Sequence, residues 1–492
     1  MRTLITEIET EHTPHSLGAQ LRGETGLVVL QSALFETSDA RFSFVSANPF
    51  ATLTARGASC RLVVGGVETP YYCNPWTLLD QLLRKYELLE ESDQPFPLGG
   101  VLGYWGYELN RSLTGKLASK AARIPDASDL CVGFYDSICV FDHRLEKCFV
   151  VSTGMQADGA RSAGLAQHRR EWWQQQLGRE STDRELPMKP LSGDLSQLHS
   201  SLSREEFVQR VTQAKAYISA GDIYQINLSH RLELPFSQDM FDMYSRLVDV
   251  SPAPYASYLA FDDIQIASSS PECFLRLSGA HIRTRPIKGT RPRSSDPQRD
   301  AQLTFELQSS AKELAELVMI TDLLRNDLGQ ICEFGSVVVP ELVRLERYPQ
   351  VQHLVSTIEG QLRSNLSHVQ ALAACFPGGS ITGTPKLRAM QLIDELEPLA
   401  RGPYTGAIGF IGFNRESHLS IAIRTAWKME DRLYFNVGAG IVADSDPAAE
   451  YDETLAKAAG FIQALADPAS ALSAARSGVS TVSPRASHGS LR

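Results

Sequence analysis

A lysine in a basic segment is the residue whose type and setting could do the most chemistry. Lys288 follows the alternating segment His281–Arg285, and Pro286 and Gly289 interrupt the pattern around it. The sequence therefore predicts a strand that gives way to a turn at Lys288. A lysine amine becomes a useful nucleophile when burial or nearby cations lower its pKa. The nearby cations in the sequence are Arg283, Arg285, Arg291 and Arg293. A basic surface turn that grips an anion is the alternative interpretation.

A candidate proton donor lies a little earlier in the chain. Glu272 follows Ser270 and Pro271 and precedes an apolar strand predicted at Cys273–Leu277. A carboxyl group at the edge of a sheet can act as a general acid if burial raises its pKa. A solvated charge at the end of a strand is the alternative.

Two predicted helices carry acidic groups. The first begins after Ser310 and places Glu313 and Glu316 on one face, because they are three residues apart. The last helix is opened by Asp446. On it lie Glu450, Glu453 and Lys457. Carboxylates from separate helices are what Mg²⁺ requires when waters and a substrate oxygen complete its ligands. Each face taken singly could simply be solvated.

Two glycine-rich segments could contact an anion through their backbone. Phe376–Gly383 leads into a helix predicted to open with Thr384 as N-cap and Pro385 as its first residue, with Lys386 in the first turn. The segment lacks the Lys-Ser/Thr ending of a Walker A loop, so a nucleotide site is not supported. Gly438–Gly440 is predicted as a glycine turn after a strand, with bare N–H groups.

The elements that must position these residues differ along the chain. Residues 1–175 are rich in predicted short strands such as Val132–Phe141, residues 178–200 form a polar connecting segment, and residues 201–466 alternate strands such as Tyr255–Phe261 with helices. The first of these helices is predicted to open with a capping box of Ser203 and Glu206. Tyr224–Leu234 alternates strictly and places Gln225 and Asn227 on a polar sheet face. Ser420–Trp427 is predicted as one strand that holds Arg424. Residues 467–492 show no pattern, and we expect them to be disordered. These patterns predict a large α+β protein.

Composition limits the class of protein. The chain has 492 residues, 43% of them hydrophobic and 21% charged, and a formal net charge of -10, which argues against general nucleic-acid binding. The N-terminus lacks the apolar run of a signal peptide, and no apolar segment is long enough to span a bilayer. Eight scattered cysteines without a CxxC pair indicate reduced thiols. We therefore expect a cytoplasmic protein that binds neither nucleic acid nor membranes.

Six motifs in the second half of the chain carry a family resemblance. They are Gly221–Asn227, Ser270–Glu272, Asp322–Leu328, His353–Ser356, Gly383–Met390 and Gly438–Ser445. In order and spacing they resemble the chorismate-utilising enzymes, the family of anthranilate, isochorismate, salicylate and aminodeoxychorismate synthases. The resemblance implies an α+β fold of two packed antiparallel β-sheets with helices on the outside and the active site in a cleft between the sheets.

Two positions sort the chemistry within this family. Members that add water carry a lysine base at the position of Gln225, so that branch is disfavoured. Anthranilate synthases carry alanine at the position of Lys288, whereas lysine is typical of component I of the aminodeoxychorismate synthases. The resemblance therefore implies conversion of chorismate and ammonia to 4-amino-4-deoxychorismate for 4-aminobenzoate and folate synthesis. An anthranilate synthase is the runner-up, and a non-catalytic sensor of small anions is the alternative from another class.

The same resemblance implies roles for individual residues. Glu272 corresponds to the acid that helps the 4-hydroxyl of chorismate leave, and Lys288 to the nucleophile that occupies C2 so that ammonia reaches C4. Glu316 and Glu453 correspond to Mg²⁺ ligands, with Glu450 close by. Expected substrate contacts are Tyr404, Arg424, Gly438, Ala439, Gly440, Ser380, Thr382, His353 and Lys457. The precise role of His353 stays open.

A regulatory pocket and a partner are also implied. The segment Leu34–Thr37 departs from the Leu-Leu-Glu-Ser sequence preferred in the tryptophan feedback site of anthranilate synthases, so binding of tryptophan would not ensure inhibition. The residues expected around that pocket are Ser32, Arg41, Phe42, Pro254 and Tyr255. The chain lacks a glutaminase nucleophile motif. Ammonia must therefore come from solution or from a separate glutamine amidotransferase subunit.

Overall fold

The computed structural model describes residues 2–33, 40–91, 93–114, 121–123, 125–181, 191, 194–348 and 350–466. The segment Leu34–Thr37, part of the connecting segment and the tail 467–492 lie outside the described residues.

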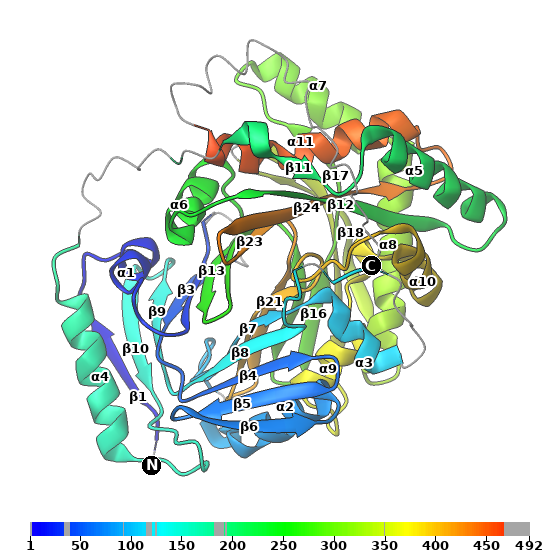
Figure 1. Ribbon diagram of the computed structural model, residues 1–492. Helices are drawn as coiled ribbons and strands as arrows, with labels where there is room; N and C mark the ends of the chain where they lie inside the picture. Colours follow the sequence, from blue (N-terminus) through cyan, green and yellow to red (C-terminus); the bar gives the residue numbers. More distant parts are fainter. Residues whose placement is uncertain are drawn as a thin grey trace, which may run out of the picture.

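Two large, open antiparallel sheets form the protein (Figure 1). In spatial order the first sheet contains β1 (Leu4–Ile8), β10 (Lys147–Ser152), β9 (Ser137–Asp142), β3 (Phe42–Ser46), β2 (Leu27–Gln31), β13 (Tyr255–Phe261), β14 (Ile264–Ser270), β23 (Thr425–Met429), β24 (Arg432–Ile441), β12 (Gln225–Pro235) and β11 (His199–Ser200), and β20 (Gly383–Thr384) pairs with β12.

The second sheet has the same number of strands. Its order is β17 (Ile287–Pro292), β19 (Val351–Gln361), β16 (His281–Arg285), β15 (Cys273–Ser278), β22 (Glu416–Ile421), β21 (Ala407–Gly412), β7 (Gly100–Trp105), β8 (Leu130–Tyr135), β4 (Ala51–Arg56), β5 (Ser59–Val64) and β6 (Val67–Tyr72), and β18 (Val338–Arg347) pairs with β19. The expected fold class, two antiparallel sheets with helices on the outside, is confirmed.

Each sheet is shared between the two halves of the sequence. In the first sheet, β2 pairs with β13. In the second, β7 pairs with β21, and Gly103 lies opposite Gly409. A Cβ atom on Gly103 would lie only 2.2 Å from the carbonyl oxygen of Cys131 in β8. This glycine therefore allows the backbones of β7 and β8 to approach closely. The strands of the first half are therefore part of the same core that carries the second half.

Helices cover the outer faces. On the first sheet lie α1 (Pro14–Gln20), α4 (Ala163–Leu177), α5 (Arg204–Ser219), α6 (Met240–Val250) and α11 (Pro447–Leu465). Near the second sheet lie α2 (Pro75–Lys85), α3 (Arg111–Thr114), α7 (Pro297–Gln308), α8 (Ala311–Gly329) and α9 (His368–Cys375), and α10 (Lys386–Leu396) packs on β12. Local signals set their starts: Ser203 and Glu206 form the predicted capping box of α5, and Ser310 caps α8.

The largest hydrophobic core contains residues of both sheets. Trp105 of β7 and Trp427 of β23 are fully buried in it. A second core lies between the first sheet and its helices and holds Trp173 of α4. Burying each side chain of this size contributes roughly 2 kcal/mol or more to stability. The first of these cores holds the two sheets in a fixed position relative to each other.

Two predicted strands are wrong in their bounds. The apolar run Val132–Phe141 is two strands, β8 and β9, because the chain turns at Asp136. The predicted strand Ser420–Trp427 is also two, β22 and β23, and Arg424 lies in the break with a φ of +48°. Apolar periodicity continues through both breaks because both flanking segments are buried.

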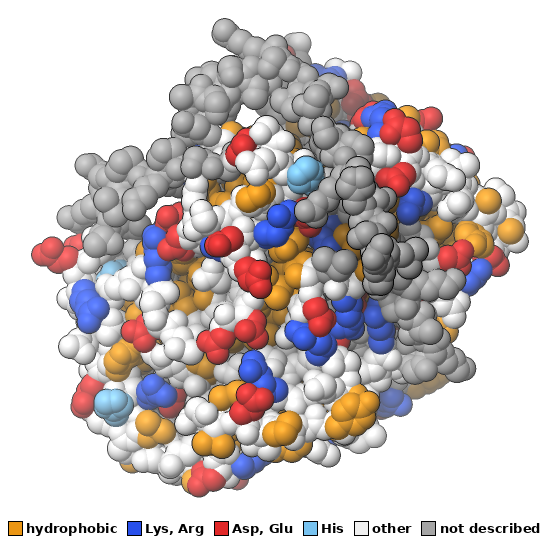
Figure 2. Space-filling view, in the orientation of Figure 1, with side chains coloured by type: hydrophobic (Ala, Val, Ile, Leu, Met, Phe, Trp, Pro, Cys, Tyr) orange, Lys and Arg blue, Asp and Glu red, His pale blue; other side chains and the backbone are white. Residues whose placement is uncertain are grey.

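Surface charge, the cysteines and the apolar character of the helices are three further features of the structure. Acidic and basic side chains are interspersed over the face seen in Figure 2. All eight cysteines are free thiols. Within the described residues, no helix combines the length and the apolar character needed to cross a membrane.

Candidate active site

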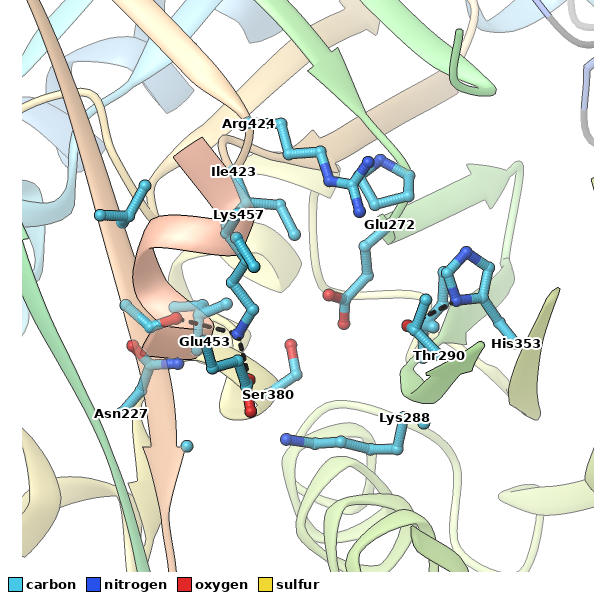
Figure 3. Close-up of a pocket in the computed structure, with 18 of the residues that line it drawn as sticks. Asn227, Glu272, Lys288, Thr290, His353, Ser380, Ile423, Arg424, Glu453 and Lys457 are labelled. Atoms are coloured by element: carbon cyan, nitrogen blue, oxygen red, sulfur yellow. Dashed lines mark hydrogen bonds and ion pairs between the residues drawn. The ribbon is translucent and has the colours of Figure 1, made fainter. Parts of the chain in front are cut away.

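A cavity of about 540 Å³ lies between the two sheets. Strands β12 and β24 of the first sheet, β17 and β19 of the second, and helices α8 and α11 contribute its walls. Most of the residues expected at the site line it: Lys288, Glu272, Tyr404, Arg424, Gly438, Gly440, Ser380, His353, Lys457, Glu316, Glu450 and Glu453. In Figure 3, Lys288, Glu272 and Ser380 extend into the same space.

Lys288 lies in a strand and not in the predicted turn. Strand β17 pairs with β19, which places Lys288 opposite Leu354, and the register shifts between Lys288 and Thr290. Gly289 lies at this register shift and has a φ of +67°. A Cβ atom on Gly289 would lie 2.7 Å from Leu307 Cδ1. Bulges of this kind redirect a neighbouring side chain. The proline and glycine that suggested a turn therefore mark the start of a strand and a bulge within it.

Lys288 has an acidic neighbour, Glu316, that the sequence did not predict. Its side chain is 14% exposed, and Nζ lies 3.8 Å from an Oε2 atom of Glu316. Across the cavity, a Cβ atom on Gly440 would lie 3.7 Å from Nζ, so the absence of a side chain there leaves room beside the amine.

The nearby arginines are held by other acids. Arg285 pairs with Glu346, Arg291 with Glu313 at 3.4 Å, and Arg293 with Asp300 at 2.9 Å. Their positive charges are therefore largely compensated away from Lys288.

Glu272 is buried between β14 and β15, and its side chain points into the cavity. Burial raises the pKa of its carboxyl to about 7, although Ser380, Lys288 and a backbone contact at Ile287 oppose this rise. A carboxyl with this pKa is partly protonated near neutral pH. It can therefore supply a proton, as a general acid must.

Arg424 brings a half-buried cation to the cavity. Its guanidinium group donates to Ser251 Oγ at 3.3 Å, and within the described part of the chain no carboxylate forms an ion pair with it. Burial lowers its pKa. A charge that is partly removed from water and lacks a counter-ion is costly, so this position favours an anionic ligand.

Three carboxylates face the cavity from two helices. Burial raises the pKa of Glu316 on α8, and Glu313 and Glu450 add to this rise. Burial also raises the pKa of Glu450 on α11, with a contribution from Glu453. Glu453 pairs with Lys457 at 2.8 Å, and its pKa is lowered, although burial acts in the opposite direction. The repulsion among these groups would be relieved by a cation.

The donor set fits Mg²⁺, although it is not a closed cage. Among the described residues, no group of three or more His, Cys, Asp or Glu side chains is placed to hold a metal. Mg²⁺ commonly takes only one or two carboxylates and fills its other positions with water and substrate oxygens. Glu316 and Glu453, on separate helices beside one cavity, match that requirement.

His353 is a neutral hydrogen-bonding group. Burial, together with the nearby charge of Arg424, lowers the pKa of His353 to about 4, although a hydrogen bond with the backbone of Gly289 acts in the opposite direction. Its Nδ1 atom lies 2.9 Å from Thr290 Oγ1. Near neutral pH it can therefore orient a ligand but does not carry a charge.

Two expected substrate contacts, Ala439 and Thr382, and Lys386 of the candidate anion-binding segment do not line the cavity. Ala439 belongs to β24, whose alternation turns its side chain into the hydrophobic core. The stretch predicted as a glycine turn is thus part of this strand. Thr382 is fully buried and donates to the backbone oxygens of Gly378 and Gly379. Lys386, expected to grip an anion, instead pairs with Asp327, and its helix begins one residue later than predicted.

Two asparagines were missed by the sequence prediction. Asn227 of β12 and Asn436 of β24 line the cavity, and the side-chain oxygen of each is buried without a hydrogen-bond partner. Unpaired buried oxygens in a cavity wall are suited to receive donors from a ligand or from water. The signal for Asn227 was present, because it shares the polar face of the alternating segment with Gln225.

A second, smaller cavity of about 50 Å³ also lies between the sheets. Ser32, Phe42, Pro254 and Tyr255, four of the five residues expected around a tryptophan pocket, line it. Arg41 does not, because it pairs with Asp142 at 2.6 Å. A space of this size holds roughly a few water molecules, which is less than an indole ring requires.

Comparisons with known proteins agree with this geometry. Residues 31–463 match the family described as chorismate binding enzyme, and the chain belongs to that family. It is 37% identical over 438 residues to aminodeoxychorismate synthase component 1 of Klebsiella aerogenes, covering 89% of this chain and 93% of the relative.

Anthranilate synthases are similarly close. The chain is 38% identical to anthranilate synthase component 1 of a Synechocystis species, covering 89% of this chain and 90% of the relative. Its structure resembles the crystal structure of anthranilate synthase component I from Streptococcus pneumoniae, with a TM-score of 0.74 and 30% identity over 87% of this chain and 93% of that one. The comparisons therefore establish the family but do not distinguish between two activities, that of an aminodeoxychorismate synthase and that of an anthranilate synthase.

Proposed function

We propose that this protein is the chorismate-aminating component of an aminodeoxychorismate synthase and converts chorismate and ammonia to 4-amino-4-deoxychorismate and water. The observation that carries the proposal is Lys288, a lysine directed into the cavity where the resembling anthranilate synthases have alanine. An anthranilate synthase has no use for an amine at this place.

The proposed chemistry uses the residues around the cavity in two steps. The Lys288 amine forms a bond to C2 of chorismate while the C4–O bond breaks, and Glu272 gives its proton to the departing hydroxyl, which leaves as water. Ammonia then bonds to C4, the ring electrons shift back, and the C2–N bond breaks, which releases Lys288 as a neutral amine because its nitrogen is an ammonium in the adduct. The new C4 ammonium group then returns a proton to the Glu272 carboxylate, which restores the acid. Occupation of C2 by lysine is what directs ammonia away from the position that would give the anthranilate-type product.

We assign substrate binding to the charged and polar side chains that line the large cavity. Arg424, a half-buried cation without a carboxylate partner in the described residues, would hold one carboxylate of chorismate. Glu316 and Glu453, with Glu450 nearby, would hold Mg²⁺, which supplies positive charge for a substrate carboxylate. Neutral His353 and the side chains of Ser380 and Tyr404 would orient the ring.

The experiment that tests the activity is incubation of the purified chain with chorismate, Mg²⁺ and an ammonium salt, followed by mass spectrometry of the products. We expect 4-amino-4-deoxychorismate, which remains non-aromatic until a lyase acts on it. Quenched enzyme should carry a chorismate-derived adduct on Lys288. Formation of fluorescent anthranilate as the main product would instead assign the alternative activity.

We also propose that ammonia is delivered by a separate amidotransferase subunit, because the chain carries no glutaminase nucleophile motif. The relatives' name, component 1, supports such an arrangement. The test compares glutamine and ammonium as nitrogen sources. The purified chain should use ammonium alone, and glutamine-dependent amination without any partner would contradict the proposal.

A further inference from the structure

An arginine outside the cavity contacts three of the segments that form it. Arg401 is 1% exposed and does not line the cavity. Its guanidinium group donates to the backbone oxygens of Asn227 at 2.8 Å and Ile381 at 3.0 Å, and to Thr405 Oγ1 at 3.2 Å. Asn227 and Ile381 line the cavity, and Thr405 directly follows Tyr404, which also lines it.

A carboxylate completes this arrangement. Glu397 is 5% exposed, and its two oxygens accept from Arg401 Nε at 2.9 Å and Nη2 at 2.7 Å. One of these oxygens also accepts from the backbone N–H of Ser229 at 2.8 Å and from its hydroxyl at 3.0 Å. All five N–H groups of the guanidinium thus have an acceptor, which requires the planar fork of arginine.

One of the three segments is held in an unfavourable backbone conformation. Thr405 has a φ of +60°, a region that β-branched residues rarely adopt. Its hydroxyl group accepts from Arg401 and donates to the backbone oxygen of Tyr404 at 2.6 Å. Strain of this kind persists where the surrounding structure imposes it, and it is common at functional sites.

The backbone atoms that Arg401 contacts are coupled to side chains in the cavity. Ile381 follows Ser380, whose side chain lies beside Glu272. The N–H of Asn227 donates to the backbone oxygen of Thr382 at 2.8 Å, which ties β12 to the segment that carries Ser380. Displacement of one segment would therefore move the others.

We infer that Arg401 and Glu397 are positioning residues for the reaction: as a buried pair, they fix Asn227, Ser380 and Tyr404 relative to one another so that these groups meet chorismate in one geometry. The inference rests on the proposed function for its kinetic readout and on the chorismate binding family alone for its binding readout. Misplacement of a site by about 1 Å can lower a rate by roughly 100-fold.

The first test is Arg401→Lys, which keeps a charge opposite Glu397 but has only three donors and no planar fork. We expect a folded protein whose kcat/KM for chorismate falls by roughly 10- to 100-fold. We also expect calorimetry to show weaker binding of chorismate. Arg401→Ala is less informative, because it leaves Glu397 buried and unpaired and could prevent folding.

Arg169→Lys is the matched control. Arg169 pairs with the buried Asp136 at 3.1 Å and donates to a backbone oxygen, but neither residue lines the cavity. The Arg169→Lys variant should have a lower melting temperature than wild type and unchanged kcat, KM and chorismate affinity. A solely structural role for Arg401 would give Arg401→Lys the same outcome, and the inference would then be wrong.

A pH profile gives a readout that loss of stability cannot imitate. The contact with Ser380 lowers the pKa of Glu272, and the charged groups around that carboxyl, Lys288 and Arg424, are unchanged in Arg401→Lys. If Ser380 is displaced, the decline of activity at high pH should move to a higher pH. An unchanged profile together with an unchanged kcat/KM would refute positioning.

The two hypotheses fail in different ways. Absence of amination by the wild-type protein refutes the proposed function. The chorismate affinity of Arg401→Lys then still decides the inference: weaker binding than in wild type and Arg169→Lys supports it, and equal binding overturns it.

Discussion

Two cavities lie between the same pair of sheets, and they differ in what surrounds them. The large one, about 540 Å³, lies where β12 and β24 face β17 and where α8 and α11 bring carboxylates and a lysine. The small one, about 50 Å³, lies between β2, β3 and β13 on one side and β21 and β22 on the other. Its walls include Phe44 and Phe410, whose rings meet edge to face at 5.0 Å.

At the large cavity, the fold places polar and charged groups that reduce stability but can take part in a reaction. Around the large cavity, Glu272 has a raised pKa, Arg424 lacks a carboxylate partner in the described residues, and Asn227 has an unpaired oxygen. Each of these costs stability unless a ligand completes it. The lining of the small cavity includes four aromatic side chains, those of Phe42, Phe44, Tyr255 and Phe410. We therefore expect changes at the large cavity to alter catalysis and changes at the small one to alter mainly stability.

The largest effect is expected for Lys288→Ala. Without the amine, the covalent route to C4 is lost, so formation of 4-amino-4-deoxychorismate should fall by roughly 10³-fold or more. Some anthranilate-type product could form by direct attack of ammonia at C2. Product analysis by mass spectrometry measures both.

The control for this variant is Lys428→Ala, which removes a lysine of β23 that donates to the backbone oxygen of Gln238 and does not line the large cavity. It should leave the product and its rate unchanged. If Lys288→Ala keeps the wild-type rate at C4, Lys288 is only an electrostatic anchor.

Glu272→Gln should have the next largest effect. It removes the proton donor, and kcat should fall by roughly 10²- to 10³-fold. In the wild-type enzyme the acid is protonated below its pKa, so kcat should decline as the pH rises through about 7. The pH–rate profile of the variant should lack this decline. A profile that keeps it would assign the titration to another group.

Glu272→Gln, which is expected to lower kcat, should raise the stability of the folded protein above pH 7. The folded-state pKa of Glu272 is raised from 4.5 to about 7, so the folded state favours the protonated form, and stability is lost as the pH rises between these values. Above pH 7, Glu272→Gln should therefore be more stable than wild type by up to about 3 kcal/mol, since one pKa unit corresponds to about 1.4 kcal/mol. Denaturant unfolding at acid and alkaline pH measures this, and equal stability at both would contradict it.

A smaller effect is expected for the carboxylates. Glu316→Gln and Glu453→Gln should each raise the Mg²⁺ concentration needed for half-maximal turnover by about 10-fold or more, because each removes one of few protein ligands. Glu306→Gln, on the exposed face of α7, is the control. A variant with the normal magnesium dependence would remove that residue from the proposed ligands.

The smallest effect is expected at the small cavity. Ser32 donates to the backbone oxygen of Pro254 at 3.2 Å, so Ser32→Ala should lower the free energy of unfolding by about 1 kcal/mol. Turnover of chorismate should be unchanged, and added tryptophan should not inhibit it. Thermal unfolding and steady-state kinetics measure both, and a loss of activity in Ser32→Ala would show that the two cavities are coupled.

Local signals in the sequence determined a large part of the fold. Strand β13 has the bounds of the predicted strand-like run Tyr255–Phe261, and the capping residues Ser203 and Ser310 start their helices as expected. Such features depend on neighbours a few residues apart, which a sequence displays directly. The motifs also predicted the family, and most of the candidate residues meet in one cavity.

Only the tertiary structure decided the surroundings of those residues. That Lys288 lies beside Glu316, and that Ala439 turns into the core, depends on strand pairings between distant segments. Arg401 shows this best, because its five acceptors come from four segments, near residues 227, 381, 397 and 405. Charge and hydrogen bonding act through space over a few ångströms, and a sequence gives spacing only along the chain.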